Sequence, residues 1–262
     1  MGTKTKLFGI VLCALAAAAC GGDENGDGGS GGTAGSGGTA GSGGTAGSGG
    51  TAGSGGTATS TVTGVVSART DAEPPIAGAT VAVFGTQIST TTNASGQFTL
   101  ENVPNGDVFF VTTATGHWGI VDYYYVPDET GGAIDLGVVP DGDITGLAGV
   151  LGRTLSDLDG IVDVTFYEGA EGGETSSISA AADAPFTFNL ADNPVEQPGV
   201  IADADGFGEL IYTSVKTADG PITATVTGVA GMTACFVDQS PGVTYPILAK
   251  SITIVYAYCQ AL

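Results

Sequence analysis

Basic residues are scarce in this 262-residue chain, which has six Lys and Arg against 27 Asp and Glu. Two of the six, Lys4 and Lys6, precede residue 20. The remainder therefore sets 27 acids against four bases, a net charge of −23. Phosphate binding needs clustered Lys and Arg, so nucleic acid is excluded as a partner. The same deficit excludes electrostatic attraction to an anionic lipid surface.

Catalytic motifs are also missing. The single histidine, His117, excludes a metal site built from several histidines. The sequence has no G-x-S-x-G nucleophile elbow and no Gly-rich phosphate loop ending in Lys, so we expect no cofactor. Glycoside cleavage needs a buried acid with a raised pKa, whereas most acids here stand beside Gly or Asn in turns. We therefore expect a non-enzymatic protein, with an envelope hydrolase as the disfavoured alternative.

Long apolar runs are absent except near the N-terminus. Residues 7–19 form an apolar run of 13 residues that follows two lysines. This run is too short to span about 30 Å of hydrocarbon, but it has the length of an export signal. Three alanines precede Cys20, and the composition changes abruptly there. Residues 1–20 therefore resemble a bacterial lipoprotein signal peptide, and the resemblance implies that Cys20 carries lipid.

Two neighbouring positions bear on this anchor. Ala17 stands where lipoproteins prefer Leu, so cleavage by ordinary signal peptidase remains an alternative. Gly21 rather than Asp follows Cys20, which by resemblance to sorted lipoproteins implies the outer membrane. The expected location is therefore the bacterial cell envelope, with the chain held at a membrane through its lipid.

Residues 21–59 read as a disordered low-complexity linker. The hexad G-S-G-G-T-A occurs five times between residues 29 and 58. Nothing larger than Thr is present in these repeats, so they cannot build a core. About 40 residues of such a coil span roughly 35 Å root-mean-square. The linker is expected to give reach and orientational freedom.

From residue 60 onward the pattern changes to short β-branched and aromatic runs separated by turn residues. Val81 and Val83 alternate with Thr80 and Ala82, which is typical of a half-buried strand. No window of ten residues shows a clean helical period. Seven short strands in about 80 residues indicate an antiparallel sandwich. The expected strands are Thr61–Ser67, Ala79–Phe84, Gln87–Thr92, Gln97–Leu100, Val108–Ala114, Ile120–Val126 and Ile134–Val139.

Four motifs in this region occur in an order that points to a known family. They are V-T-G-V-V, P-I-A-G-A-T-V-A-V, T-N-A-S-G-Q-F-T-L-E-N-V-P-N-G and V-F-F-V-T-T-A-T-G-H. Residues 60–142 resemble the carboxypeptidase regulatory-like domain. The resemblance implies a transthyretin-like sandwich, a fold often grouped with carbohydrate-binding-like folds.

Residues 143–262 repeat the pattern less clearly. The run G-I-V-D-V-T-F from residue 160 is similar to residues 78–84 of the first module. An acidic stretch, residues 168–198, interrupts the match and reads as a loop. The chain is therefore expected to be all-β, with two small antiparallel transthyretin- or Ig-like sandwich modules after the linker.

Two cysteines remain after export, Cys235 and Cys259. In an oxidising compartment an even pair predicts a disulfide, which would stabilise the second module by roughly 3 kcal/mol. A reactive thiol pair is the alternative. The acidic pairs Asp141–Asp143 and Asp203–Asp205 offer oxygens for calcium, but Asp in turns normally bonds its own backbone. We expect no metal site.

The best lead to function is an aromatic cluster in residues 117–125. In a strand, Tyr123 and Tyr125 point to one face and Tyr124 to the other. Exposed rings of Trp118, Tyr123 and Tyr125 would suit stacking on a sugar, whereas buried rings would only close a sandwich. The favoured function is a lipid-anchored envelope protein whose non-catalytic modules bind carbohydrate or a cell-surface protein. The alternative is a structural spacer or adhesin stalk without a small-molecule site.

Overall fold

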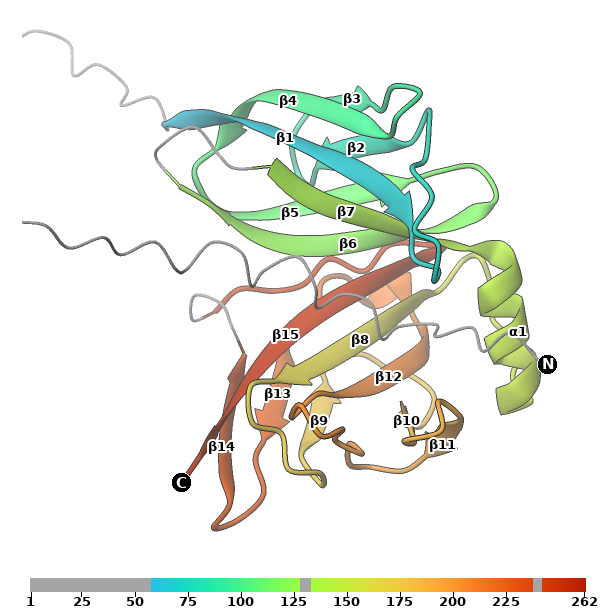
Figure 1. Cartoon of the computed structure of the whole chain (residues 1–262), viewed down its shortest axis with the longest axis vertical. Helices are drawn as coiled ribbons and strands as arrows, with labels where there is room; N and C mark the ends of the chain where they lie inside the picture. Colours follow the sequence, from blue (N-terminus) through green and yellow to red (C-terminus); the bar gives the residue numbers. More distant parts are fainter. Residues whose placement is uncertain (1–57, 128–132, 238–241) are drawn as a thin grey trace, which may run out of the picture.

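The computed structural model describes residues 58–127, 133–237 and 242–262. The expected export segment, Cys20 and linker residues 21–57 lie outside the described residues. The described chain is almost entirely β-structure, with one short α-helix (Figure 1). The all-β sandwich fold predicted from the sequence is therefore confirmed. Within these ranges, no helix is long and apolar enough to cross a membrane.

Seven strands form the first module, and all seven were expected. One layer has the order β4-β1-β7, the other has the order β3-β2-β5-β6, and β6 and β7 also pair briefly at one end. The β1–β7 pair is parallel, which the alternation of side chains cannot reveal. The strands are β1 (Thr59–Ala68), β2 (Thr80–Val83), β3 (Ser89–Thr91), β4 (Gln97–Pro104), β5 (Gly106–Thr113), β6 (His117–Val126) and β7 (Ala133–Pro140).

The core of the first module fills the space between these two layers. Its buried side chains come from alternate positions of the strands and include Val62, Val81, Phe98, Leu100 and Phe110. Gly64 of β1 fits between its two neighbours in the same layer, because an added Cβ would lie 2.7 Å from the ring of Phe98 on β4 and 2.1 Å from the carbonyl oxygen of Ile134 on β7. A larger residue at 64 would force the backbone apart.

The helix α1 (Asp141–Leu151) follows β7 directly and was not expected. Three glycines at positions 142, 146 and 149 weaken its helical pattern, since Gly is a poor helix former. It buries only Ile144 and Leu147. The chain leaves the helix at Gly152, whose φ of 64° is the left-handed conformation that ends many helices. Packing of two side chains, rather than intrinsic propensity, therefore accounts for α1.

The second module contains eight strands and one short 3-10 helix. The stretch 168–198, expected to be a loop, contains three short strands, β9, β10 and β11. A separate two-stranded sheet pairs β9 with β13. The elements are β8 (Gly160–Tyr167), β9 (Thr175–Ile178), β10 (Phe186–Phe188), β11 (Pro194–Glu196), β12 (Gly208–Val215), η1 (Thr217–Asp219), β13 (Ala224–Thr227), β14 (Thr233–Val237) and β15 (Ser251–Ala261).

Arg153 holds part of this stretch against the rest of the module. Its guanidinium donates to Thr213 Oγ1 and to the carbonyl oxygen of Ala184, both over 2.8 Å, and it pairs with Glu196. It also lies 6.0 Å from the ring centroid of Phe186. The Arg153 side chain is only 11% exposed. Its hydrogen bonds and its ion pair therefore replace the water that the guanidinium loses on burial.

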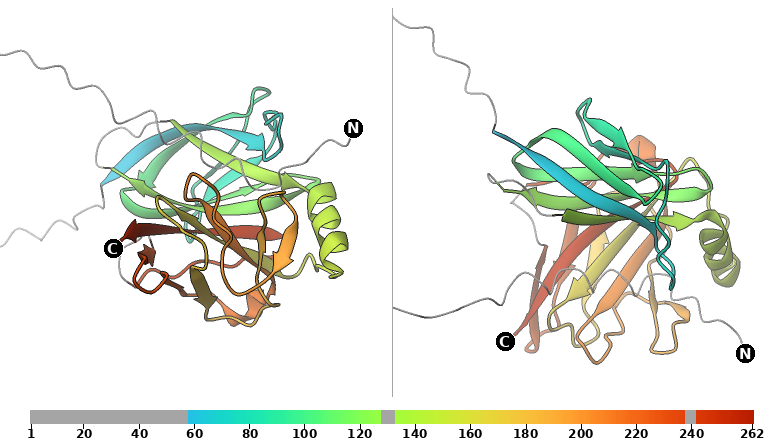
Figure 2. Two further views of the ribbon diagram at one scale, coloured as in Figure 1. Left: turned by 60° about the horizontal axis from the view of Figure 1, so that its bottom comes forward. Right: turned by 45° about the horizontal axis from the view of Figure 1, so that its top comes forward.

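The two modules share one continuous sheet. The C-terminal strand β15 pairs in parallel with β8 of its own module and with β6 of the first module. The resulting order is β3-β2-β5-β6-β15-β8-β12-β10-β11, and both figures show β15 beside β6 where the modules meet (Figures 1 and 2). We call this pairing of β6 with β15 the module seam. The modules are therefore joined by backbone pairing between strands as well as by the connecting segment.

Besides the cores of the two modules, a further apolar cluster covers the module seam, and α1 contributes to it. Trp118 lies in this cluster with only 4% of its surface exposed. Its neighbours come from both modules, so the cluster disappears if the modules separate. The buried members are Trp118, Ile120, Val139, Ile144, Leu147, Ile161, Phe186, Ile211, Ile252 and Ile254.

Replacing Trp118 should test this seam. We expect Trp118→Ala to lower the free energy of unfolding by about 3–5 kcal/mol, the usual cost of removing a buried aromatic ring. The measurement is a denaturant unfolding curve. Tyr125→Ala is the control, because its ring is 68% exposed and its removal should change stability by less than about 0.5 kcal/mol. Equal stability of the two variants would contradict a core at the seam.

Candidate functional site

The predicted alternation of the tyrosines in β6 holds. Tyr123 and Tyr125 share one face of the strand, on the side opposite to Trp118. Tyr125 is 68% exposed, whereas Tyr123 is half-buried and donates its hydroxyl hydrogen to Asp107 Oδ1 over 2.6 Å. The ring of Tyr123 lies 5.8 Å from that of Phe109 on β5. The two tyrosines therefore do lie side by side on a surface.

This surface continues toward the second module. Phe109 packs at 5.8 Å against Tyr245, whose ring is buried in the second core. Phe84, which is 42% exposed, lies next to Phe109 through a hydrogen bond from its backbone N–H to the Phe109 carbonyl oxygen. We call Phe84, Phe109, Tyr123 and Tyr125 the outer aromatic face. Among its rings, Phe109 contacts both modules, through Tyr123 of the first and Tyr245 of the second.

Trp118 does not belong to this face. The ring lies in the apolar cluster over the seam and offers no surface for stacking on a ligand. The exposed Trp118 considered in the sequence analysis is therefore corrected to a core residue. The reason is the strand β15, which comes from far along the chain and turns an edge of the first module into an interior. The neighbouring His117 Nδ1 lies 2.9 Å from the carbonyl oxygen of Thr115.

Besides Glu174, three carboxyl groups lie in the interior. Asp122 on β6, Asp163 on β8 and Glu209 on β12 are 2%, 2% and 5% exposed. Each lies two residues from a seam isoleucine, so all three share that face of the continuous sheet. We call them the carboxyl band. An acid inside an apolar β-run, as in I-V-D-V, was the feature that could have revealed them.

Burial controls the ionisation of these groups. It raises the pKa of Asp122 to about 6, although the hydrogen bond from Tyr256 and the charge of Arg69 act in the opposite direction. It raises the pKa of Asp163 to about 7. Burial and then the charge of Asp163 raise the pKa of Glu209 well above its ordinary range. Near neutral pH the band therefore holds protons that exposed carboxyl groups would have released.

An aromatic row borders the carboxyl band on the same face. Phe236, Tyr258 and Tyr167 lie directly across β14, β15 and β8 from one another. Their ring centroids are 6.0 Å and 4.7 Å apart, and Tyr256 lies 5.8 Å from Tyr167. Tyr256 also donates its hydroxyl hydrogen to Asp122 Oδ1 over 2.8 Å. The sequence analysis missed this row, because its members come from three separate strands.

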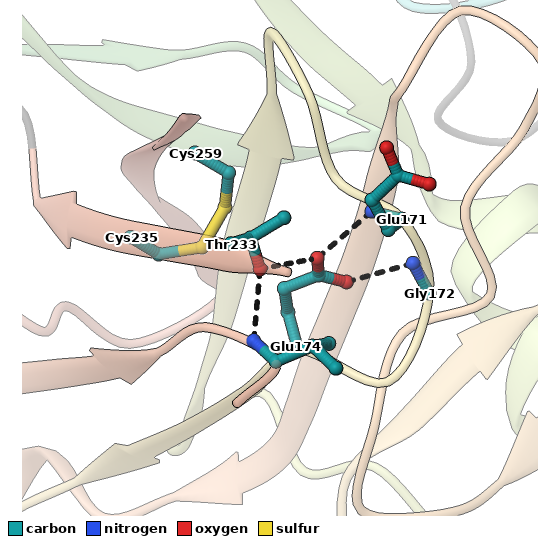
Figure 3. Close-up of a disulfide and its surroundings, with 7 residues drawn as sticks. Glu171, Gly172, Glu174, Thr233, Cys235 and Cys259 are labelled. Atoms are coloured by element: carbon teal, nitrogen blue, oxygen red, sulfur yellow. Dashed lines mark hydrogen bonds between the residues drawn. A yellow bond between two sulfur atoms is a disulfide. The ribbon is translucent and has the colours of Figure 1, made fainter. Parts of the chain in front are cut away.

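The predicted disulfide between Cys235 and Cys259 is confirmed. The cysteines lie opposite each other on β14 and β15, with Cα atoms 4.1 Å apart. The bond closes a loop of 24 residues and fixes the last strand to its neighbour. Beside it lies Glu174, fully buried and directed toward backbone amides (Figure 3). The sequence analysis gave Glu174 no role.

One aspartate of each acidic pair considered for calcium has another partner. Asp203 Oδ1 accepts hydrogen bonds from the backbone N–H groups of Asp205 and Phe207, which is an ordinary turn. Asp141 Oδ2 lies 2.9 Å from Lys250 Nζ in an ion pair. These contacts account for Asp203 Oδ1 and Asp141 Oδ2, whereas Asp141 Oδ1 and Asp143 Oδ2 are buried and accept no hydrogen bond from the described residues.

One known protein family matches the first module. Residues 61–131 match the family model of the carboxypeptidase regulatory-like domain. This agrees with the resemblance drawn from the four motifs. No curated protein sequence matches the chain.

Several solved structures share weak similarity with the chain. The Bacillus anthracis TIE protein is 13% identical with a TM-score of 0.28; the match covers 78% of this chain but only 34% of that one. The shaft pilin SpaA from Lactobacillus rhamnosus GG is 13% identical with a TM-score of 0.25, covering 78% and 99%. A family CBM26 module from Eubacterium rectale Amy13K, solved with maltoheptaose, is 11% identical with a TM-score of 0.28, covering 77% and 96%. At these scores the similarities decide neither ligand nor assembly.

The carboxyl band makes a testable prediction about pH. Its acids bind protons more tightly in the folded state than in the unfolded chain, so they lower stability as pH rises from about 4 through 7. Between pH 5 and pH 8 the free energy of unfolding should fall, and Asp163 should account for about 3 kcal/mol over the two pH units below its pKa. Thermal or urea unfolding across this range measures the slope.

Two matched variants distinguish the effect of the carboxyl band on the pH slope from the effect of the overall negative charge of the chain. Asp163→Asn should flatten the slope, because Asn keeps the shape and cannot ionise. Asp71→Asn removes an exposed acid and should leave the slope unchanged. If both variants kept the slope of the parent chain, the band would not be its source.

Proposed function

We propose that the chain is a lipid-anchored envelope protein whose two sandwich modules form one non-catalytic unit that binds carbohydrate. The observation that carries this proposal is the outer aromatic face. Tyr125 presents most of its ring to solvent, and Tyr123 is oriented by its hydrogen bond to Asp107. A sugar ring that stacks on these side chains gains apolar contact without charge pairing.

The fixed position of the rings supports binding. Tyr123 packs on Phe109, and Phe109 packs on Tyr245 of the other module. Rings that are already ordered lose little conformational entropy when a ligand arrives. The net charge of −23 after residue 20 would repel acidic polymers, so a neutral or basic glycan fits the face best.

The absence of catalysis is part of the proposal. Asp143 on α1 is one acid with a raised pKa. The others form the carboxyl band, on the face opposite to the tyrosines of the outer aromatic face. Each is at least 95% buried. A general acid must reach the glycosidic oxygen of its substrate, and groups this deeply buried meet that requirement poorly.

Binding can be tested with insoluble polymers and the chain that starts at residue 21. Sedimentation with cellulose, chitin, starch and peptidoglycan should find at least one polymer that retains the protein. Tyr125→Ala should weaken that retention about tenfold, equivalent to about 1.4 kcal/mol, with no loss of stability. Leu190→Ala is the control, since this side chain is 77% exposed in the turn after β10, far along the sheet.

Two results would contradict carbohydrate binding at this face. One is the failure of all four polymers to retain the chain. The other is retention that Tyr125→Ala leaves unchanged. Either would favour the alternative function, a structural spacer or adhesin stalk whose aromatic residues serve packing alone.

The lipid anchor needs its own test, because Cys20 lies outside the described residues. We expect the cell-purified protein to begin at an acylated Cys20 and to fractionate with the outer membrane. Cys20→Ala should move it to the soluble fraction. Mass spectrometry of the N-terminal peptide measures the acyl chains. A mature N-terminus without them would replace lipidation by ordinary signal-peptide cleavage.

A further inference from the structure

Glu174, Cys235 and Cys259 meet at one point inside the second module. One carboxylate oxygen and the two sulfur atoms all lie within 4.8 Å of one another. Figure 3 shows Glu174 near the Cys235–Cys259 disulfide. Glu174 is completely buried, and Cys259 is 1% exposed. A buried acid next to sulfur is costly unless it is compensated, so its contacts need an explanation.

The carboxylate of Glu174 is held in a fixed orientation. Its Oε1 accepts the N–H of Glu171 over 2.8 Å and the hydroxyl of Thr233 over 3.0 Å. Its Oε2 accepts the N–H of Gly172 over 2.9 Å. An ionised carboxylate has about four lone-pair sites, so these three donors leave one acceptor direction, on Oε2. Such supporting hydrogen bonds are what orient ligands in metal sites.

We propose that, when the disulfide is reduced, Glu174, Cys235 and Cys259 form a binding site for a thiophilic divalent cation such as Zn²⁺ or Cd²⁺. Two thiolates and one carboxylate are ligands that these cations accept in tetrahedral sites. Such a site needs ligand atoms about 3.6–3.8 Å apart, from metal–ligand distances of about 2.0–2.3 Å. The carboxylate has to move by only about 1 Å, while the two sulfurs separate as their bond breaks.

The chemistry balances with a thiol reductant. A dithiol supplies two electrons and two protons, the Cys235–Cys259 bond breaks into two thiols, and the dithiol becomes a disulfide. Binding of the cation then displaces the two protons as two metal–sulfur bonds form. Since the same sulfur electrons make either bond, the disulfide and the metal site exclude each other.

The summed negative charge of the three ligands makes this site depend on a bound cation. Two thiolates and a carboxylate would place three negative charges in a buried space, which is costly without a cation to balance them. A divalent cation reduces the total to one negative charge. Hard cations such as Ca²⁺ and Mg²⁺ prefer oxygen ligands and gain little from the sulfurs. The site should therefore discriminate strongly in favour of thiophilic cations.

The test is a titration of the reduced protein with Cd²⁺. The chain from residue 21 is reduced with dithiothreitol, freed of reductant without oxygen, and titrated while near-ultraviolet thiolate-to-cadmium absorption is recorded. We expect one equivalent to bind and no such absorption in the oxidised protein. Glu174→Gln should weaken binding at least tenfold. Glu171→Gln is the control, because it removes an exposed neighbouring carboxylate and keeps the N–H that supports Glu174.

Folding of the reduced chain is followed in the same samples. One equivalent of Cd²⁺ should raise the melting temperature of the reduced protein, and the increase should be smaller for Glu174→Gln. Equal Cd²⁺ affinity of Glu174→Gln and the parent chain would overturn the proposal, since cadmium would then be held by the cysteines alone. A reduced chain that is unfolded would also bind Cd²⁺ with equal affinity in both variants, and it would overturn the proposal in the same way. Absence of stoichiometric absorption in the reduced parent chain would overturn it as well.

Discussion

Three residues of β15, paired with three residues of β6, determine how the rest of the molecule packs. Ser251–Thr253 lie in parallel register with Gly119–Val121. Gly119 of β6 lies close to β5 of its own module, because an added Cβ would come within 2.6 Å of the carbonyl oxygen of Thr112, whereas the Cβ of Ser251 on β15 would lie 3.7 Å away. With β8 on its other side, β15 becomes an interior strand whose first five residues are all buried. Its two buried hydroxyl side chains have partners, because Ser251 Oγ donates to the carbonyl oxygen of Leu248 and Thr253 Oγ1 donates to that of Pro246.

The seam also explains the environment of the polar groups. An acid on an edge strand would face water, whereas Asp122 lies beside a strand that brings Tyr256 to its carboxylate. Asp163 and Glu209 are interior for the same reason, since they extend the seam face across β8 and β12. Hydroxyl donors lie next to two of these carboxyl groups, Tyr256 at Asp122 and Thr165 at Asp163. Burial favours the neutral form of all three, because a buried charge without a partner is expensive.

Local patterns predicted the strands well and their partners poorly. The seven strands of the first module follow from short-range alternation and turn residues such as Gly96, which has a φ of 73°. The disulfide follows from the count of cysteines and their expected compartment. The burial of Trp118 could not be inferred from its local sequence, because β15, which pairs beside β6, comes more than 130 residues later in the chain. The helix α1 was missed because its glycines conceal the two residues that it buries.

The placement of β1 has a mechanical consequence. This strand receives the segment that precedes the sandwich, and it lies between β4 on one side and β7 on the other. A force applied through that segment acts along the axis of β1, across hydrogen bonds that run roughly perpendicular to it. The bonds on both edges then share the load in shear instead of opening one after another. A domain held in this way resists tension applied at its first strand while the rest of the fold keeps its shape.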